Sequence, residues 1–110
     1  MTRAELIHAV GDALTNLDLI RFDLHLTDPR RAGVNAQRAE LGRLLDLLVD
    51  AEIDDTTAAY GEATALLIPL NADLKATAAD LGKLKTALET VGKVVDVLKQ
   101  VAGVVLPLIP

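Results

Sequence analysis

Residues 60–105 repeat apolar side chains every seven positions: YGEATALLIPLNADLKATAADLGKLKTALETVGKVVDVLKQVAGVV. One register begins at Tyr60 and is apolar throughout, and a second begins at Ala63 and is interrupted only by Thr77. A seven-residue apolar repeat is typical of a helix that packs on another helix in a left-handed coiled-coil seam. The pattern therefore predicts one long helix over about residues 56–105.

Pro69 is the position in this stretch that a helix tolerates least. A proline inside a helix removes one backbone hydrogen bond and clashes with the preceding turn, at a cost of about 3 kcal/mol. The chain could kink there and continue, or it could turn there, with Asn71 capping a separate fourth helix of a four-helix bundle. A turn would keep the heptad phase in only about one of seven registers. Because the phase is kept, we favour the kinked helix, and a four-helix bundle broken at Pro69 is the alternative.

The first of two shorter helices is expected over about residues 2–26. Thr2 and Glu5 fit a capping box, in which each side chain bonds the backbone amide of the other residue. Apolar positions then recur at intervals of three and four, as on one face of a helix. Residues 17–26 also alternate apolar and polar side chains, as a strand paired with residues 101–109 would. We favour the helix because long periodic segments are the more dependable signal.

The second shorter helix is expected over about residues 29–53, since Thr27 and Asp28 before Pro29 are typical of a helix start. At 1.5 Å per residue, a helix of about 50 residues reaches ~75 Å, whereas each shorter helix reaches less than ~40 Å. The two shorter helices would therefore cover only half of the long apolar seam. An uncovered seam of this size predicts an elongated helical bundle that associates with another copy or with a partner helix.

The large apolar residues of the two registers form the predicted interaction seam. A non-enzymatic scaffold that self-associates or binds a partner helix through this seam is the expected function. The seam residues are Leu67, Leu70, Leu74, Leu81, Leu84, Leu88, Val91, Val95, Leu98 and Val105.

A single helical domain, residues 1–110 with an apolar tail at 106–110, suits the length of the chain. Charged residues recur in the N-terminal segment, so no export signal is expected there. The longest uncharged runs, residues 63–72 and 100–110, hold 10 and 11 residues, whereas a membrane-spanning helix needs about 20. The cytoplasm is therefore the default location. Both runs contain proline and could lie in a membrane interface, so a lipid-surface protein, a particle coat or a component of a pore-forming system is the alternative function.

The composition excludes several classes of function. The chain has no Cys and no Ser, which rules out disulfides, Cys-ligated zinc and the commonest catalytic nucleophiles. A net charge of −5 and only two aromatic residues, Phe22 and Tyr60, do not suit a protein that binds phosphates or stacks bases. We therefore expect no enzymatic activity, no cofactor and no nucleic-acid partner.

The two histidines are the remaining candidates for metal binding. Glu5 and His8 form a Glu-x-x-His motif, and Asp12 follows one turn later. Di-metal helical bundles use this motif twice, and it occurs here once. We therefore expect no metal, with His8 on a solvated face and His25 in local ion pairs.

All six Arg precede residue 44, and all five Lys follow residue 74. A basic patch formed by Arg30, Arg31 and Arg38 is expected to face the acidic region around Asp54 in an antiparallel assembly.

Overall fold

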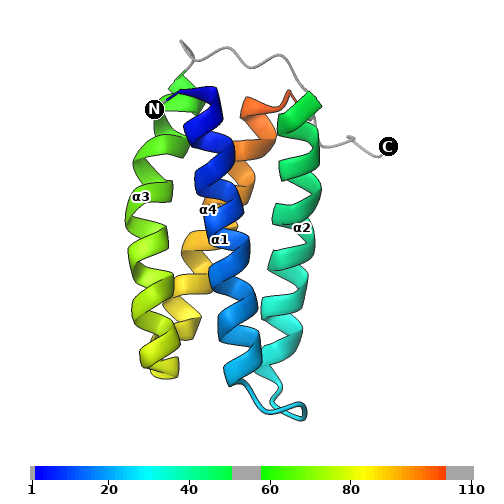
Figure 1. Cartoon of the computed structure of the whole chain (residues 1–110), viewed down its shortest axis with the longest axis vertical. Coiled ribbons are helices and arrows are strands. Elements are labelled where there is room, and N and C mark those ends of the chain that lie inside the picture. Colours follow the sequence, from blue (N-terminus) through cyan, green and yellow to red (C-terminus); the bar gives the residue numbers. More distant parts are fainter. Residues whose placement is uncertain (1, 51–57, 104–110) are drawn as a thin grey trace, which may run out of the picture.

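Four helices make up most of the chain in the computed structural model, which describes residues 2–50 and 58–103 (Figure 1). No strand occurs in these ranges. The predicted all-α class is confirmed, and the strand considered for residues 17–26 is wrong. The helices are α1 (Arg3–Asp23), α2 (Arg30–Asp50), α3 (Ala58–Ala79) and α4 (Leu84–Val101), with a single 3₁₀ turn, η1 (Leu81–Lys83), before α4.

The helices form a bundle in which each one packs mainly on two neighbours. α1 lies between α2 and α3, and α4 lies behind it, packed on the same two helices (Figure 1). α1 and α3 run in one direction, and α2 and α4 run in the other (Figure 1). The radius of gyration is 14.0 Å, close to the ~13 Å expected of a compact domain of this length. The predicted elongated shape is therefore wrong.

Each helix buries one apolar stripe, and the four stripes meet in a single core. In α1, α3 and α4 the buried positions alternate at intervals of three and four residues, as in coiled-coil packing. The stripe of α1 runs from Leu6 to Ile20, and that of α2 runs from Val34 to Leu48. The α3 stripe is Tyr60, Ala63, Leu67, Leu70, Leu74 and Thr77, and the α4 stripe is Leu84, Ala87, Val91, Val94, Leu98 and Val101.

The predicted long helix over residues 56–105 is wrong, because the chain turns between Ala79 and Leu84. Asp80 has an extended backbone (φ −144°, ψ 93°), and its side chain accepts a hydrogen bond from the Gly82 amide at 3.0 Å. An Asp that bonds the backbone two residues later is a common turn former. The turn leads through η1 directly into α4.

The heptad pattern continues through this turn because the register that begins at Ala63 is buried both in α3 and in α4. Leu84 continues that register into the core of α4. In the other register Leu88 is only half-buried, and Ala87 and Val94 occupy the core instead. The phase of the seam therefore changes at the turn. The change is hidden in the sequence because α4 has a wide apolar face that also buries Val95.

Pro69 lies inside α3, which continues to Ala79. The alternative of a bundle broken at Pro69 is therefore right about the four-helix architecture and wrong about where the chain turns. The proline deprives the carbonyl of Ala65 of its helical donor, and both residues are exposed. Water can reach that carbonyl from the solvent side, which explains why the helix tolerates the proline at this position.

Candidate interaction surface

The predicted interaction seam lies in the chain's own core, so its expected exposure is wrong. Because α3 and α4 fold back on each other, α1 and α2 can cover both helices, and no half of the seam is left bare. Leu81 and Leu88 are half-buried, and Val105 lies outside the described residues. The buried members are Leu67, Leu70, Leu74, Leu84, Val91, Val95 and Leu98.

Two arginines close the ends of the α1–α2 hairpin. Arg3, at the start of α1, donates to the carbonyl of Leu48 at 3.2 Å and to the next carbonyl at the end of α2. Arg31, at the start of α2, donates to the carbonyls of Arg21 at 2.8 Å and Leu24 at 3.0 Å at the end of α1. The last carbonyls of a helix lack intrahelical donors, and a cation beside them is favoured by the helix dipole. Both arginines therefore stabilise the hairpin.

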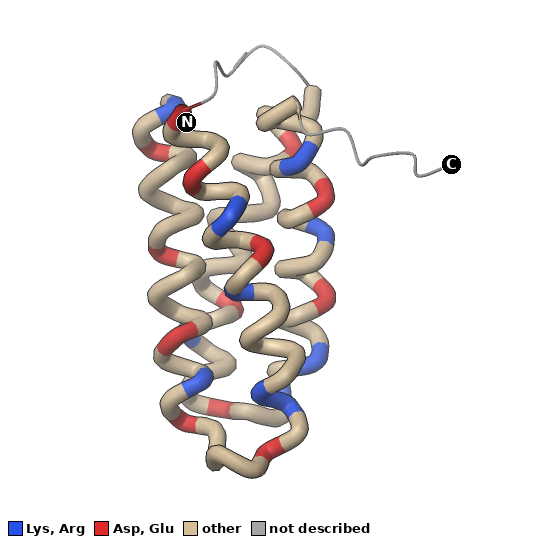
Figure 2. Tube along the Cα trace, turned by 90° about the vertical axis from the view of Figure 1, so that its right-hand side faces the viewer, with Lys and Arg blue, Asp and Glu red and all other residues tan. Residues whose placement is uncertain are grey.

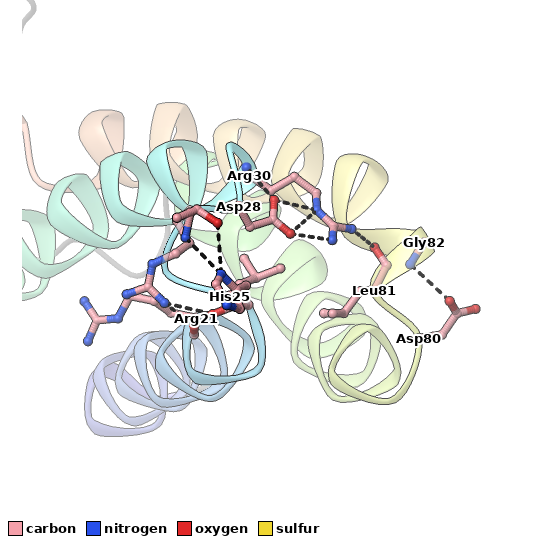
Figure 3. A network of polar contacts seen from close by, with 10 residues as sticks. Arg21, His25, Asp28, Arg30, Asp80, Leu81 and Gly82 are labelled. Atoms are coloured by element: carbon pink, nitrogen blue, oxygen red, sulfur yellow. Dashed lines mark hydrogen bonds and ion pairs between the residues drawn. The ribbon is translucent and has the colours of Figure 1, made fainter.

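The other members of the predicted basic patch are also paired within the chain. Arg38 on α2 bonds both carboxylate oxygens of Asp18 on α1. Arg30 bonds both oxygens of Asp28, the shortest distance being 2.7 Å, and reaches the carbonyl of Leu81 at 3.4 Å (Figure 3). Arg30 thus connects the α1–α2 loop to the α3–α4 turn. The patch is engaged within the chain, and because its acidic counterpart lies outside the described residues, the antiparallel assembly stays a prediction.

The ion pair in this loop predicts a dependence of stability on pH. Hydrogen bonds from the Arg30 side chain and amide lower the pKa of Asp28 from 3.8 to about 2. Because the folded-state pKa is depressed, the ionised carboxylate stabilises the fold above the ordinary pKa, and this contribution is lost as the pH falls toward 2. We expect Asp28→Asn to lessen the loss of stability between pH 5 and pH 2, as measured by urea unfolding at both pH values. An unchanged pH dependence, with Asp46→Asn as the control, would contradict this role.

Two asparagines bridge α1 and α3. The side-chain amide of Asn16, which is 6% exposed, donates to Asn71 Oδ1 at 3.3 Å. Asn71 in turn donates to the carbonyl of Ala9 at 3.1 Å. Asn71 lies inside α3, so it does not cap a helix as the Pro69 break required. A polar pair in an otherwise apolar helix contact favours one register of the two helices.

Both histidines make local contacts at the surface. His8 Nε2 lies 3.5 Å from Asp12 Oδ2, and both side chains are exposed. His25 Nδ1 lies 2.9 Å from the hydroxyl of Thr27 in the loop after α1. Among the residues that the structure describes, no group of three or more His, Cys, Asp or Glu could hold a metal ion.

Four large apolar side chains are exposed on α1, on the loop after it and on α3, and we call them the exposed apolar set. Leu19 (52% exposed) and Phe22 (79%) lie one turn apart on α1, and Leu26 (82%) follows in the loop. Ile68 (66%) lies on α3. All four lie off the core stripes, so burial in this chain does not account for them.

A groove between α1 and α3 adjoins Ile68, and we call it the α1–α3 groove. Its volume is about 480 Å³. It combines small apolar side chains with two carboxylates. The lining residues are Ala4, Glu5, His8, Ala9, Asp12, Ile68 and Asn71.

The opposite side of the bundle is more highly charged. Figure 2 faces α2, and charged residues of both signs lie along α2 and α4. α2 carries seven charged residues in 21, whereas α3 carries only three in 22, namely Glu62, Asp73 and Lys75. α3 is therefore poor in charge, and the groove that it forms with α1 is lined by two carboxylates.

Sequence reasoning missed this face, although signals for it exist. Leu19 and Phe22 lie off the α1 stripe of Val10, Leu17 and Ile20, which marks them as outward-facing apolar residues. Ile68 belongs to the uncharged run 63–72, which was attributed to the seam or to a membrane interface.

No helix within residues 2–50 and 58–103 combines the length and apolar character needed to cross a bilayer. No family model matches the chain, and no curated protein or solved structure is similar enough to be matched to it. The surface itself is therefore the basis for a functional proposal.

Proposed function

We propose that this chain is a non-enzymatic helical interaction module that binds a partner protein through the outer face of α1 and α3. The exposed apolar set is the observation that carries the proposal. Above all, Phe22, the chain's one phenylalanine, is 79% exposed, and aromatic residues are enriched where protein surfaces bind one another.

The energetics of apolar burial support an interface on this face. Covering apolar surface stabilises a complex by about 25 cal/mol per Å². Contiguous apolar surface exposed on a folded domain is typical of an association site. The core is complete without these side chains, so they are free to contact another molecule.

A paired surface variant tests the proposal. We expect Leu19→Ser with Phe22→Ser to weaken binding of the partner by roughly tenfold or more, because two apolar contacts are lost. The partner is isolated by cross-linking in the native cell, and its affinity for the purified chain is then measured by calorimetry.

The matched control is Leu47→Ser with Val49→Ser on α2, where the replaced side chains are 36% and 52% exposed. This pair should bind like the unchanged chain, and both variants should keep the same helical circular dichroism. The proposal is wrong if the two pairs of substitutions weaken binding equally, or if only the α2 pair does so.

The lipid-surface alternative gives a different outcome in the same variants. If the exposed apolar set inserted into a membrane, the chain would sediment with phospholipid vesicles, and Leu19→Ser with Phe22→Ser would abolish this. Sedimentation of that kind, without a protein partner, would overturn the proposed function.

A further inference from the structure

We propose that the α1–α3 groove receives an amphipathic helix of the partner protein whose flanks carry Lys or Arg. This inference rests on the proposed function and specifies the chemistry of the partner.

The shape of the groove suits a helix. α1 and α3 run in the same direction side by side (Figure 1), so a third helix can lie along both. Ala4 and Ala9 line the groove with side chains of one carbon each, which lets a partner backbone approach closely. Ile68 stands beside them and is 66% exposed, so it offers the larger apolar contact. Docking of the apolar side of a helix into such a groove is a common mode of recognition.

The charge of the groove selects the partner. Glu5 and Asp12 line it, and no Lys or Arg does. The nearest arginines in the chain sequence are engaged elsewhere, Arg3 with the carbonyls at the end of α2 and Arg21 with Asp18. Glu5 keeps its charge because hydrogen bonds from Thr2 lower the pKa of its carboxyl. A cationic flank on the incoming helix therefore complements the groove.

Other occupants fit this charge less well. A second copy would bring Glu5 and Asp12 toward the same two carboxylates of its partner, and like charges in an interface disfavour association. Anionic lipid headgroups and nucleic-acid phosphates would meet the same repulsion. The second copy is an outcome of the test below, and vesicle sedimentation, given above, tests the lipid surface.

The probe is a fluorescent synthetic peptide of three Leu-Lys-Lys-Leu-Leu-Lys-Leu heptads, titrated with the full chain by fluorescence anisotropy. A second peptide with Glu in place of every Lys keeps the same apolar side. We expect the Lys peptide to bind and the Glu peptide not to bind. Binding of the Lys peptide should weaken at physiological salt, where screening is effective beyond about 8 Å.

Two variants with the same net charge show whether the groove is the site. Glu5→Gln with Asp12→Asn should weaken binding of the Lys peptide by about fivefold or more, and Gln at position 5 can still serve the capping box. Asp46→Asn with Asp50→Asn on α2 should leave binding unchanged. Ile68→Ser should weaken binding at low salt and at physiological salt alike, because that contact is apolar.

If the two charge variants weakened binding of the Lys peptide equally, the attraction would depend on net charge alone and not on the groove, and the inference would be wrong. The inference would also be wrong if the Lys peptide did not bind, if the Glu peptide bound equally well, or if Ile68→Ser left binding unchanged. Dimers seen by light scattering and disrupted by Glu5→Gln with Asp12→Asn would likewise overturn it. The proposed function is tested separately from this inference. If Leu19→Ser with Phe22→Ser abolished binding of the natural partner and Glu5→Gln with Asp12→Asn did not, the proposed function would stand and only the inference of a basic helix would be wrong.

Discussion

Val94→Asp should unfold the chain at neutral pH, whereas Leu88→Asp should leave it helical. Val94 is 0% exposed in the core, and Leu88 is half-buried at its edge. A carboxylate at position 94 would lie among apolar side chains, at a cost of several kcal/mol, while total stabilities are only about 5–15 kcal/mol. At position 88 the carboxylate can reach water. Circular dichroism and thermal unfolding of the two variants measure the difference.

The same pair of variants distinguishes the bundle from the long helix. In an uninterrupted heptad Leu88 lies on the seam and Val94 lies off it, so the long helix requires the opposite order of effects. An unfolded Leu88→Asp variant beside a folded Val94→Asp variant would therefore contradict the turn at Asp80.

Leu67→Ala should lower the free energy of unfolding by about 2–5 kcal/mol, the usual range for a leucine deleted from a packed core. Leu67 is 0% exposed within the single chain. The loss should therefore be the same over a hundredfold range of protein concentration. Urea unfolding followed by circular dichroism measures both the size of the loss and its dependence on concentration.

Ile68→Ala is the matched control, because the next residue on α3 is 66% exposed. Substitutions at exposed positions usually change stability by less than about 0.5 kcal/mol. An unfolding midpoint that rises with protein concentration would mean that the seam packs between chains, and it would contradict the core described above.

Much of the N-terminal half was predictable because its signals are local. The capping box of Thr2 and Glu5 is present, with hydrogen bonds of 3.2 and 3.0 Å. The expected helices over 2–26 and 29–53 correspond to α1 (Arg3–Asp23) and α2 (Arg30–Asp50). At the ends that the structure describes, the predicted bounds are off by up to three residues, as frayed helix ends commonly are, and the predicted end at residue 53 lies outside the described residues.

The prediction for the C-terminal half was wrong because of one inference, namely that an unbroken heptad phase implies an unbroken helix. Periodicity reports which residues are apolar and not which of them are buried. Leu88 and Val94 are both apolar, and only the packing of α4 on α2 and α3 distinguishes them. The turn itself is formed by Asp80 and Gly82, a short local pair that the heptad pattern does not reveal.

The candidate surface was the least predictable feature, because exposure depends on which distant segments cover a helix. Residues 22, 24 and 26 alternate with polar residues like a strand, yet Leu24 enters the core and its two apolar neighbours remain outside. That difference arises because α1 ends at Asp23 and the chain turns toward α2. No local rule predicts how α3 then lies beside α1.

The arginine contacts at both ends of the α1–α2 hairpin relate the lengths of its two helices, which are the arms of the hairpin. Each arm has 21 residues, and each arm's first turn carries the guanidinium that bonds the last turn of the other. Because both contacts form in the same hairpin, the positions of the two helix ends depend on each other. The lengths of α1 and α2 are therefore coupled, and a change in the length of one helix should be matched by a change in the other.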